Sequence, residues 1–233
     1  MNPGWKEFWN TENSIDVSDK HTRAHYEQLA HGMLELIPPM RPHTLLDWGC
    51  GDALSTPAFA QAGITVLLHD PVPRFTERLR KRFGATPGVR VLDSEEAARI
   101  PRASIDTILV YSVIQYLAKE EFERLLSRFY ELLAPGGALI LGDVIPERHP
   151  LLTDVGDLLR TALRHGFFFE ALTGLAATFF SRYRKVRKES GFSTYSETEM
   201  LSLLARHSFK AERLPRNLGL STHRMLFRAR RSS

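Results

Sequence analysis

The chain has 233 residues, of which 43% are hydrophobic and 25% charged, a composition typical of a globular protein with one large folded domain. Cys50 is the only cysteine, which excludes an intramolecular disulfide and a cysteine-cluster metal site and fits a reducing, cytoplasmic setting. No apolar run follows a basic start at the N-terminus, and the most apolar stretch, 166–180, is shorter than the roughly 20 residues of a transmembrane helix. We therefore expect neither a secretory signal nor a membrane span.

The net charge of +4 is unevenly distributed along the chain. Residues 1–150 carry 16 basic and 20 acidic side chains, whereas residues 151–233 carry 15 and 7. A basic excess of this kind occurs on faces that bind nucleic acid or anionic membranes, and also on ordinary solvated surfaces. Charge alone therefore does not identify a partner.

The N-terminal region predicts a helix over 19–37. Its apolar side chains recur at helical spacing, and two consecutive prolines, Pro38 and Pro39, end it. We assign residues 1–40 to an N-terminal helical cap.

From residue 44 onward, strand and helix patterns alternate. Short apolar runs predict strands over 44–48, 64–68, 89–92, 107–110 and 138–145. Helices are expected between them: one with Thr56 as N-cap and Pro57 in its first turn, one that ends at Gly84, and one over 120–133. This alternation predicts an α/β fold with a doubly wound, Rossmann-like sheet that is mostly parallel.

The alternation of strand and helix patterns ends after Pro146. Residues 150–190 are rich in phenylalanine and predict two helices, which we interpret as a helical lid insert in a single domain of residues 1–233. Ser196 and Glu199 have the spacing of a capping box and start a helix that runs to about His207. Runs at 209–214 and 224–228 predict an antiparallel hairpin at the edge of the sheet.

The strongest chemical signal follows the first predicted strand, in the sequence Asp47-Trp-Gly-Cys-Gly-Asp-Ala53. Two glycines separated by one residue permit a sharp turn and let a ligand approach the backbone. A dinucleotide-binding fingerprint is disfavoured because Leu54 occupies the position of its third small residue. Asp70, at the end of the second strand, is placed to accept hydrogen bonds from two ribose hydroxyls.

Together with three later segments, this motif resembles the class I S-adenosylmethionine-dependent methyltransferases that act on small molecules. The segments are LLDWGCGDA, LLHDPVP, SIDTILVYSVIQYL and LLAPGGALILGDV, which lie in register from about Leu45 to Val144. Ala53 stands where this family most often has a third glycine, and we expect it to keep a negative φ. The resemblance implies S-adenosylmethionine as the cofactor and methyl transfer as the activity.

The resemblance also implies roles for individual residues. Asp47, Gly49 and Gly51 would hold the methionine part of the cofactor, Asp70 the ribose, and Val72 the adenine ring. The acid that meets the adenine amino group would come from residues 93–96, with Glu95 favoured and Ser94 next. The backbone of Tyr111 would lie beside the sulfonium.

A general base is needed only where the methyl acceptor is still protonated near neutral pH. Candidates must follow the fourth and fifth strands, where open α/β sheets bind ligands. Asp143, His149 and Tyr116 meet this condition, as does Gln115 as a polar group. No spacing of histidines indicates a metal site.

The acceptor is expected to be a small apolar or amphipathic molecule, methylated on oxygen or nitrogen. The aromatic and basic residues of 167–188 would line its site, or contact an anionic membrane and make the protein membrane-peripheral, or simply form a packed face and a solvated one. Methylation of nucleic acid is less favoured, because Tyr111-Ser112-Val113-Ile114 offers no stacking clamp for an extruded base. A third interpretation is a cofactor-binding partner protein without catalysis.

Overall fold

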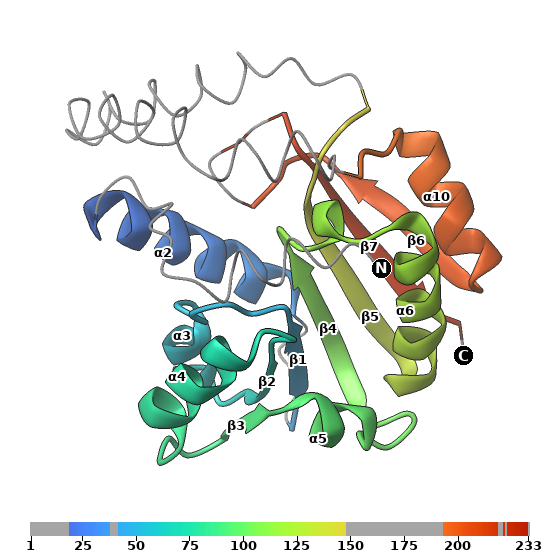
Figure 1. Cartoon of the computed structure of the whole chain (residues 1–233). Helices are drawn as coiled ribbons and strands as arrows, with labels where there is room; N and C mark the ends of the chain where they lie inside the picture. The colour runs from blue at the N-terminus through green and yellow to red at the C-terminus, as the bar shows by residue number, and fades with distance from the viewer. Residues whose placement is uncertain (1–18, 38–41, 148–192, 219–220, 222, 233) are drawn as a thin grey trace.

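The computed structural model describes residues 19–37, 42–147, 193–218, 221 and 223–232, and a seven-stranded sheet forms the centre of this part (Figure 1). The strands are β1 (Thr44–Trp48), β2 (Thr65–His69), β3 (Val89–Leu92), β4 (Ile105–Tyr111), β5 (Leu133–Val144), β6 (Phe209–Leu214) and β7 (Met225–Arg231). Their order is β3-β2-β1-β4-β5-β7-β6. All neighbouring pairs from β3 to β5 are parallel, and β7 is antiparallel to both of its neighbours. The doubly wound sheet and its antiparallel edge hairpin are confirmed.

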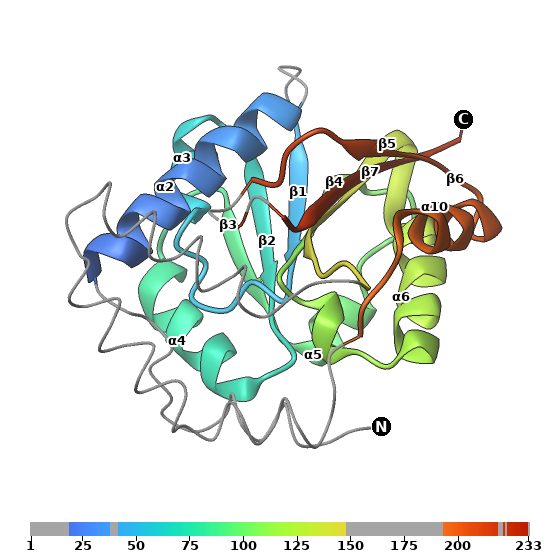
Figure 2. The same cartoon turned by 90° about the horizontal axis from the view of Figure 1, so that it is seen from above.

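Helices lie on both sides of this sheet (Figures 1 and 2). They are α2 (Asp19–Leu36), α3 (Thr56–Gln61), α4 (Pro73–Phe83), α5 (Ser94–Ala98), α6 (Lys119–Leu132) and α10 (Glu197–Arg206), with a short 3-10 turn, η1 (Ile114–Tyr116). Apolar side chains of α2 and α3 join one hydrophobic cluster, and those of α6 and α10 join a second on the other face. The sheet is therefore covered on both faces.

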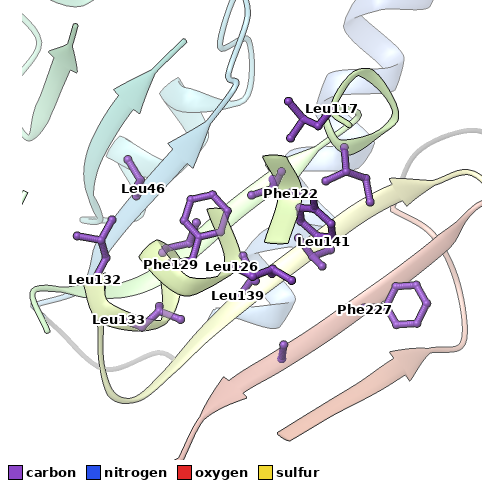
Figure 3. Close-up of a cluster of buried hydrophobic side chains, with 14 of the residues drawn as sticks. Leu46, Leu117, Phe122, Leu126, Phe129, Leu132, Leu133, Leu139, Leu141 and Phe227 are labelled. Atoms are coloured by element: carbon purple, nitrogen blue, oxygen red, sulfur yellow. The ribbon is translucent and has the colours of Figure 1, made fainter. Parts of the chain in front are cut away.

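Two-sided burial explains why β1 has no polar alternation. Leu45 and Leu46 are both fully buried, but they belong to the two different hydrophobic clusters. Successive side chains of a strand point to opposite faces, so both faces need apolar residues here. Around Leu46, the cluster is completed by Phe122, Phe129 and other side chains of α6 and β5 (Figure 3).

The chain leaves and rejoins the sheet at one place beyond the end of β5. The Tyr195 N–H donates to the carbonyl of Ile145 at 3.1 Å, and the Glu147 N–H donates to the carbonyl of Tyr195 at 3.1 Å. Pro146 and Tyr195 form a parallel β-bridge. The predicted lid insert, 150–190, lies between these paired segments and outside the described residues.

Three local expectations need correction. Ser55, not Thr56, is the N-cap of α3, and its hydroxyl donates to the carbonyl of Tyr26 at 3.3 Å instead of capping the helix. β5 begins at Leu133 rather than at residue 138, because Leu133 already pairs with Ile105 before the intervening turn.

The third correction concerns the predicted capping box. Ser196 accepts a hydrogen bond from the Glu199 N–H at 3.1 Å as expected, but the Glu199 carboxylate pairs with Lys119 of α6 rather than with the N-cap backbone. Among the described residues, no helix is long and apolar enough to cross a membrane.

Candidate functional site

The glycine loop, residues 49–53 between β1 and α3, is shaped by contacts that only glycine allows. Gly49 has φ +76°, and its N–H donates to the carbonyl of His69 at 2.7 Å. A Cβ added to Gly49 would lie 2.5 Å from Cγ2 of Val113, in the turn after β4. Gly51 has φ +53°, and no atom of the described residues lies within 4 Å of the place where its Cβ would be. The loop therefore packs tightly at Gly49 and exposes bare backbone at Gly51.

Ala53 departs from its expected conformation. Its φ is +49°, so the expectation of a negative φ is wrong. The residue is 4% exposed and lies at the turn into α3, where the left-handed conformation costs a residue with a Cβ roughly 1–2 kcal/mol. Backbone strain of this kind persists only where the surrounding structure requires it, and strained residues of this kind are often found in functional loops.

Asp70 connects the end of β2 to the glycine loop. Its Oδ2 accepts a hydrogen bond from the Gly51 N–H at 3.0 Å, and its Oδ1 accepts one from the Val72 N–H at 2.9 Å. Burial raises the pKa of Asp70 to about 6, although these two backbone hydrogen bonds lower it. The backbone thus orients both carboxylate oxygens, which leaves further lone pairs for the two hydroxyls of a ribose.

Asp47, at the fourth position of β1, is a second buried carboxylate. It is 8% exposed, and within the described residues its carboxylate forms no ion pair. Burial, and next the negative charge of Asp70, raise the pKa of Asp47 from its ordinary 3.8 to about 7. Two buried acids that pair with no cation of the described residues provide a site that a positively charged ligand would stabilise.

A cavity of about 200 Å³ lies beyond Asp70. It is lined by residues from the ends of β2 and β3 and from α4, namely Asp70, Pro71, Pro73, Thr76, Glu77, Arg80, Asp93 and Ser94. Ser94, one of the two adenine contacts favoured by the sequence, lies in this lining. Glu95 does not, because its carboxylate pairs with Arg99 and its side chain is 75% exposed. Val72 is 2% exposed and packs in the hydrophobic core.

Asp93 lines the same cavity in the place of Glu95. It is the N-cap of α5, where its Oδ1 accepts hydrogen bonds from the N–H groups of Glu95 and Glu96. Its Oδ2 accepts a hydrogen bond from Nη2 of Arg80 at 2.9 Å. The capping role fixes Asp93 at the cavity edge.

Asp143 is surrounded by donors at the carboxyl end of β5. Its Oδ2 accepts hydrogen bonds from Ser112 Oγ at 2.5 Å and from Nη1 of Arg224 at 2.7 Å. Its Oδ1 lies 3.3 Å from Nδ2 of Asn217, and its N–H donates to Oδ1 of Asn217 at 3.2 Å. Asp143 and Ser112 both have positive φ, +62° and +57°. The Asp143 carboxylate thus joins the turn after β4 to the connection between β6 and β7.

The remaining sequence candidates are spread over the turn after β4 and beyond it. Tyr111 ends β4, and its hydroxyl lies 3.4 Å from Nδ2 of Asn217. Tyr116 is half-buried in η1 and packs against the core. Gln115 is buried beside it. His149 lies outside the described residues.

Asn217 and Arg224 hold the Asp143 carboxylate, but no pattern in the sequence indicates that they do so. They lie in the connection between β6 and β7, and 74 and 81 residues separate them from Asp143. Their contacts depend on the antiparallel edge strands returning beside β5, which no local motif encodes.

Comparisons with known proteins support the inference from this geometry. Residues 46–141 match the model of the methyltransferase domain family, a span that begins within β1 and ends within β5. An uncharacterized methyltransferase from Oceanobacillus iheyensis is 28% identical over 138 residues, which cover 58% of this chain and 61% of that protein. These similarities support a class I S-adenosylmethionine-dependent methyltransferase.

Two further relatives extend this comparison. A trans-aconitate 2-methyltransferase from Azoarcus is 28% identical over 133 residues, covering 57% of the chain and 49% of that protein. The crystal structure of the Burkholderia thailandensis 1,6-didemethyltoxoflavin-N1-methyltransferase, bound to that substrate and S-adenosylhomocysteine, has a TM-score of 0.54 at 18% identity. It covers 89% of this chain and 77% of the other. The matches to the curated relatives thus span about half to three-fifths of their lengths, and the distant structure shows the shared fold.

The candidate site shows no metal-binding cluster in the part of the chain that the structure describes. No group of three or more histidine, cysteine, aspartate or glutamate side chains there is arranged to hold a metal ion. Burial raises the pKa of the Cys50 thiol in the glycine loop, which disfavours a reactive thiolate.

Proposed function

We propose that this protein transfers the methyl group of S-adenosylmethionine to an oxygen or nitrogen atom of a small apolar or amphipathic molecule and releases S-adenosylhomocysteine. The observation that carries this proposal is the pair of buried carboxylates, Asp47 and Asp70, on either side of an exposed glycine backbone. S-adenosylmethionine carries an ammonium, a sulfonium and a ribose diol, which together match the charge and the acceptors of this site.

The residues present fit the cofactor part by part. Asp47 supplies the negative charge for the ammonium, and the bare backbone of Gly51 leaves space for the methionine portion. Asp70, already oriented by Gly51 and Val72, accepts the ribose hydroxyls. The cavity next to it receives the adenine ring, with Asp93 or Ser94 as its polar contact in place of Glu95.

When bound, the cofactor supplies a methyl group that its sulfonium already activates. The protein's task is then to align a nucleophile with the methyl–sulfur bond and to exclude water, and alignment of this kind contributes roughly 7–11 kcal/mol to barrier reduction. Tyr111 and Ser112 lie at the end of β4, next to the glycine loop, where their backbone would face the sulfonium. Asp143 holds Ser112 in its left-handed conformation from the neighbouring strand end.

We assign the role of general base to no single residue. Asp143 is engaged by Ser112, Asn217 and Arg224, and we assign it a positioning role. His149 and Tyr116 stay as candidates for acceptors whose nucleophile must lose a proton before attack. A contact of residues 167–188 with anionic membrane likewise stays a prediction.

Isothermal calorimetry tests the cofactor assignment. S-adenosylmethionine and S-adenosylhomocysteine should bind with micromolar affinity, and Asp70→Ala should weaken both at least tenfold because it removes the ribose acceptor. Glu131→Gln, a change of a half-exposed carboxylate of α6 paired with Arg102, is the control and should alter affinity by less than threefold. Binding of NADH without binding of S-adenosylmethionine would contradict the proposal.

A further inference from the structure

Gln115 carries a buried hydrogen-bond acceptor that nothing in the described structure satisfies. The residue is 4% exposed, and its Nε2 donates to the backbone carbonyl of Ser112 at 2.8 Å. A carbonyl oxygen only accepts, so the atom that faces Ser112 must be the amide nitrogen. Oε1 therefore occupies the other branch of the amide, where it is buried and has no partner among the described residues.

Such an atom calls for an explanation, because buried polar groups in folded proteins are nearly always hydrogen-bonded. Leaving an acceptor unpaired costs roughly 1–3 kcal/mol. An apolar side chain of similar size at position 115 would avoid that cost. The carboxamide is therefore most simply explained by a donor that arrives with a ligand.

The position of Gln115 in the fold indicates which ligand. It lies in η1, directly after β4, and the sheet order reverses between β1 and β4. Open α/β sheets bind their ligands at the carboxyl ends of the strands on either side of such a reversal. Val113, in the same turn, packs against Gly49 of the glycine loop. Gln115 thus belongs to the turn that covers the methionine end of the proposed cofactor site.

The neighbouring polar side chains are anionic or already hydrogen-bonded, so Gln115 differs from them as a neutral hydrogen-bond acceptor without a partner among the described residues. Asp47 and Asp70 are anionic groups matched to the ammonium and the ribose, and the Asp143 carboxylate is held by Ser112, Asn217 and Arg224. A neutral carboxamide oxygen cannot take up a proton near neutral pH, but it can hold an N–H or O–H group in a fixed direction.

We propose that Oε1 of Gln115 faces the position of methyl transfer and accepts a hydrogen bond from the nucleophilic atom of the acceptor. This inference rests on the proposed function and narrows its substrate class to alcohols, phenols, amines and other nucleophiles that carry an N–H or O–H. Carbon nucleophiles, thioethers and tertiary amines have no such hydrogen. Gln115 is on this basis a specificity-determining residue.

The reaction balances without a proton transfer to Gln115. The nucleophile's lone pair forms the new bond to the methyl carbon while the carbon–sulfur bond breaks toward sulfur, and the nucleophile's proton then leaves to solvent or to a base. The hydrogen bond to Oε1 directs the lone pair toward the methyl group.

The test uses sinefungin, an analogue of S-adenosylhomocysteine in which an amine-bearing carbon replaces the sulfur, so that an N–H donor stands near the methyl position. We expect the wild-type protein to bind sinefungin about tenfold more tightly than S-adenosylhomocysteine, because hydrogen bonds to charged groups are among the stronger ones. Gln115→Met, which keeps the length but removes the acceptor, should abolish this preference and leave the dissociation constant of S-adenosylhomocysteine within twofold. Gln61→Met, the same change at the exposed end of α3, is the matched control and should preserve the preference.

Each other outcome has a defined meaning. An unchanged preference in Gln115→Met overturns the proposal, and so does a wild-type protein that binds both ligands equally. A parallel loss of both affinities also overturns it, because Gln115 would then only hold the turn. Gln115→Leu provides the same comparison if the methionine variant does not fold. If neither ligand binds the wild-type protein, the proposed function itself fails.

Discussion

Replacing Asp47 by asparagine should stabilise the empty protein at alkaline pH and impair cofactor binding. Because burial raises the pKa of Asp47 from 3.8 to about 7, its folded form binds more protons than its unfolded form between these values. Folding free energy is therefore lost as pH rises through this range. About three pKa units correspond to a loss of about 4 kcal/mol of folding free energy above pH 7, and to less than half of that loss at pH 5.

The asparagine side chain is neutral at every pH but introduces a buried amide, which costs about 1–2 kcal/mol without good partners. We therefore expect Asp47→Asn to raise the free energy of unfolding by about 2 kcal/mol at pH 8 and to change it little at pH 5. Urea denaturation of both proteins at the two pH values, without ligand, measures this difference. The affinity for S-adenosylmethionine should fall at least tenfold, since the charge that faces its ammonium is gone.

Glu131→Gln is the control, because Glu131 is a half-exposed carboxylate of α6 that pairs with Arg102, away from the glycine loop. A variant at position 47 that is equally stable or less stable at pH 8, with no difference between the two pH values, would refute the reasoning. It would mean that the Asp47 carboxylate is satisfied in the free protein.

Three further changes test other parts of the account. Ala53→Gly should raise the free energy of unfolding by about 0.5–1 kcal/mol, because relief of left-handed strain exceeds the entropy cost of glycine; a lower thermal midpoint by circular dichroism would contradict this. Replacing residues 150–190 by a short Gly-Ser linker should leave cofactor affinity within a few-fold and abolish methyl transfer, since the flanking segments pair directly; equal loss of both would reject the lid interpretation. If the basic run of 182–188 contacts lipid, the protein should float with anionic vesicles at low salt and be released near 1 M, where the Debye length is about 3 Å; binding to neither anionic nor neutral vesicles would leave that run a solvated face.

Much of the sheet and the cofactor loop could be predicted because the signals are local. The apolar run 44–48 encodes a strand buried on both faces, and the two glycines after it encode the turn. Asp70 follows the next strand at a position where its carboxylate must reach the loop. These features depend on neighbouring residues and on the fixed geometry of a parallel sheet.

Features that depend on distant contacts could not be predicted. The engagement of Asp143 by Asn217 and Arg224 requires the edge hairpin to return beside β5, so the sequence left Asp143 as a candidate base. The positive φ of Ala53 is imposed by the loop around it and contradicts the preference of alanine itself. Glu95 pairs with Arg99 at the surface and Asp93 caps α5, and neither contact could be predicted from the sequence.

Methyl transfer itself is the most direct test of the central claim. The protein is incubated with methyl-tritiated S-adenosylmethionine and a cell extract, and the label is then separated into small molecules, nucleic acid and protein, with Asp70→Ala as the inactive control. The account predicts label in an extractable small molecule, an equal amount of S-adenosylhomocysteine, and neither product with the variant. Label confined to nucleic acid, or cofactor binding without any transfer, would contradict it.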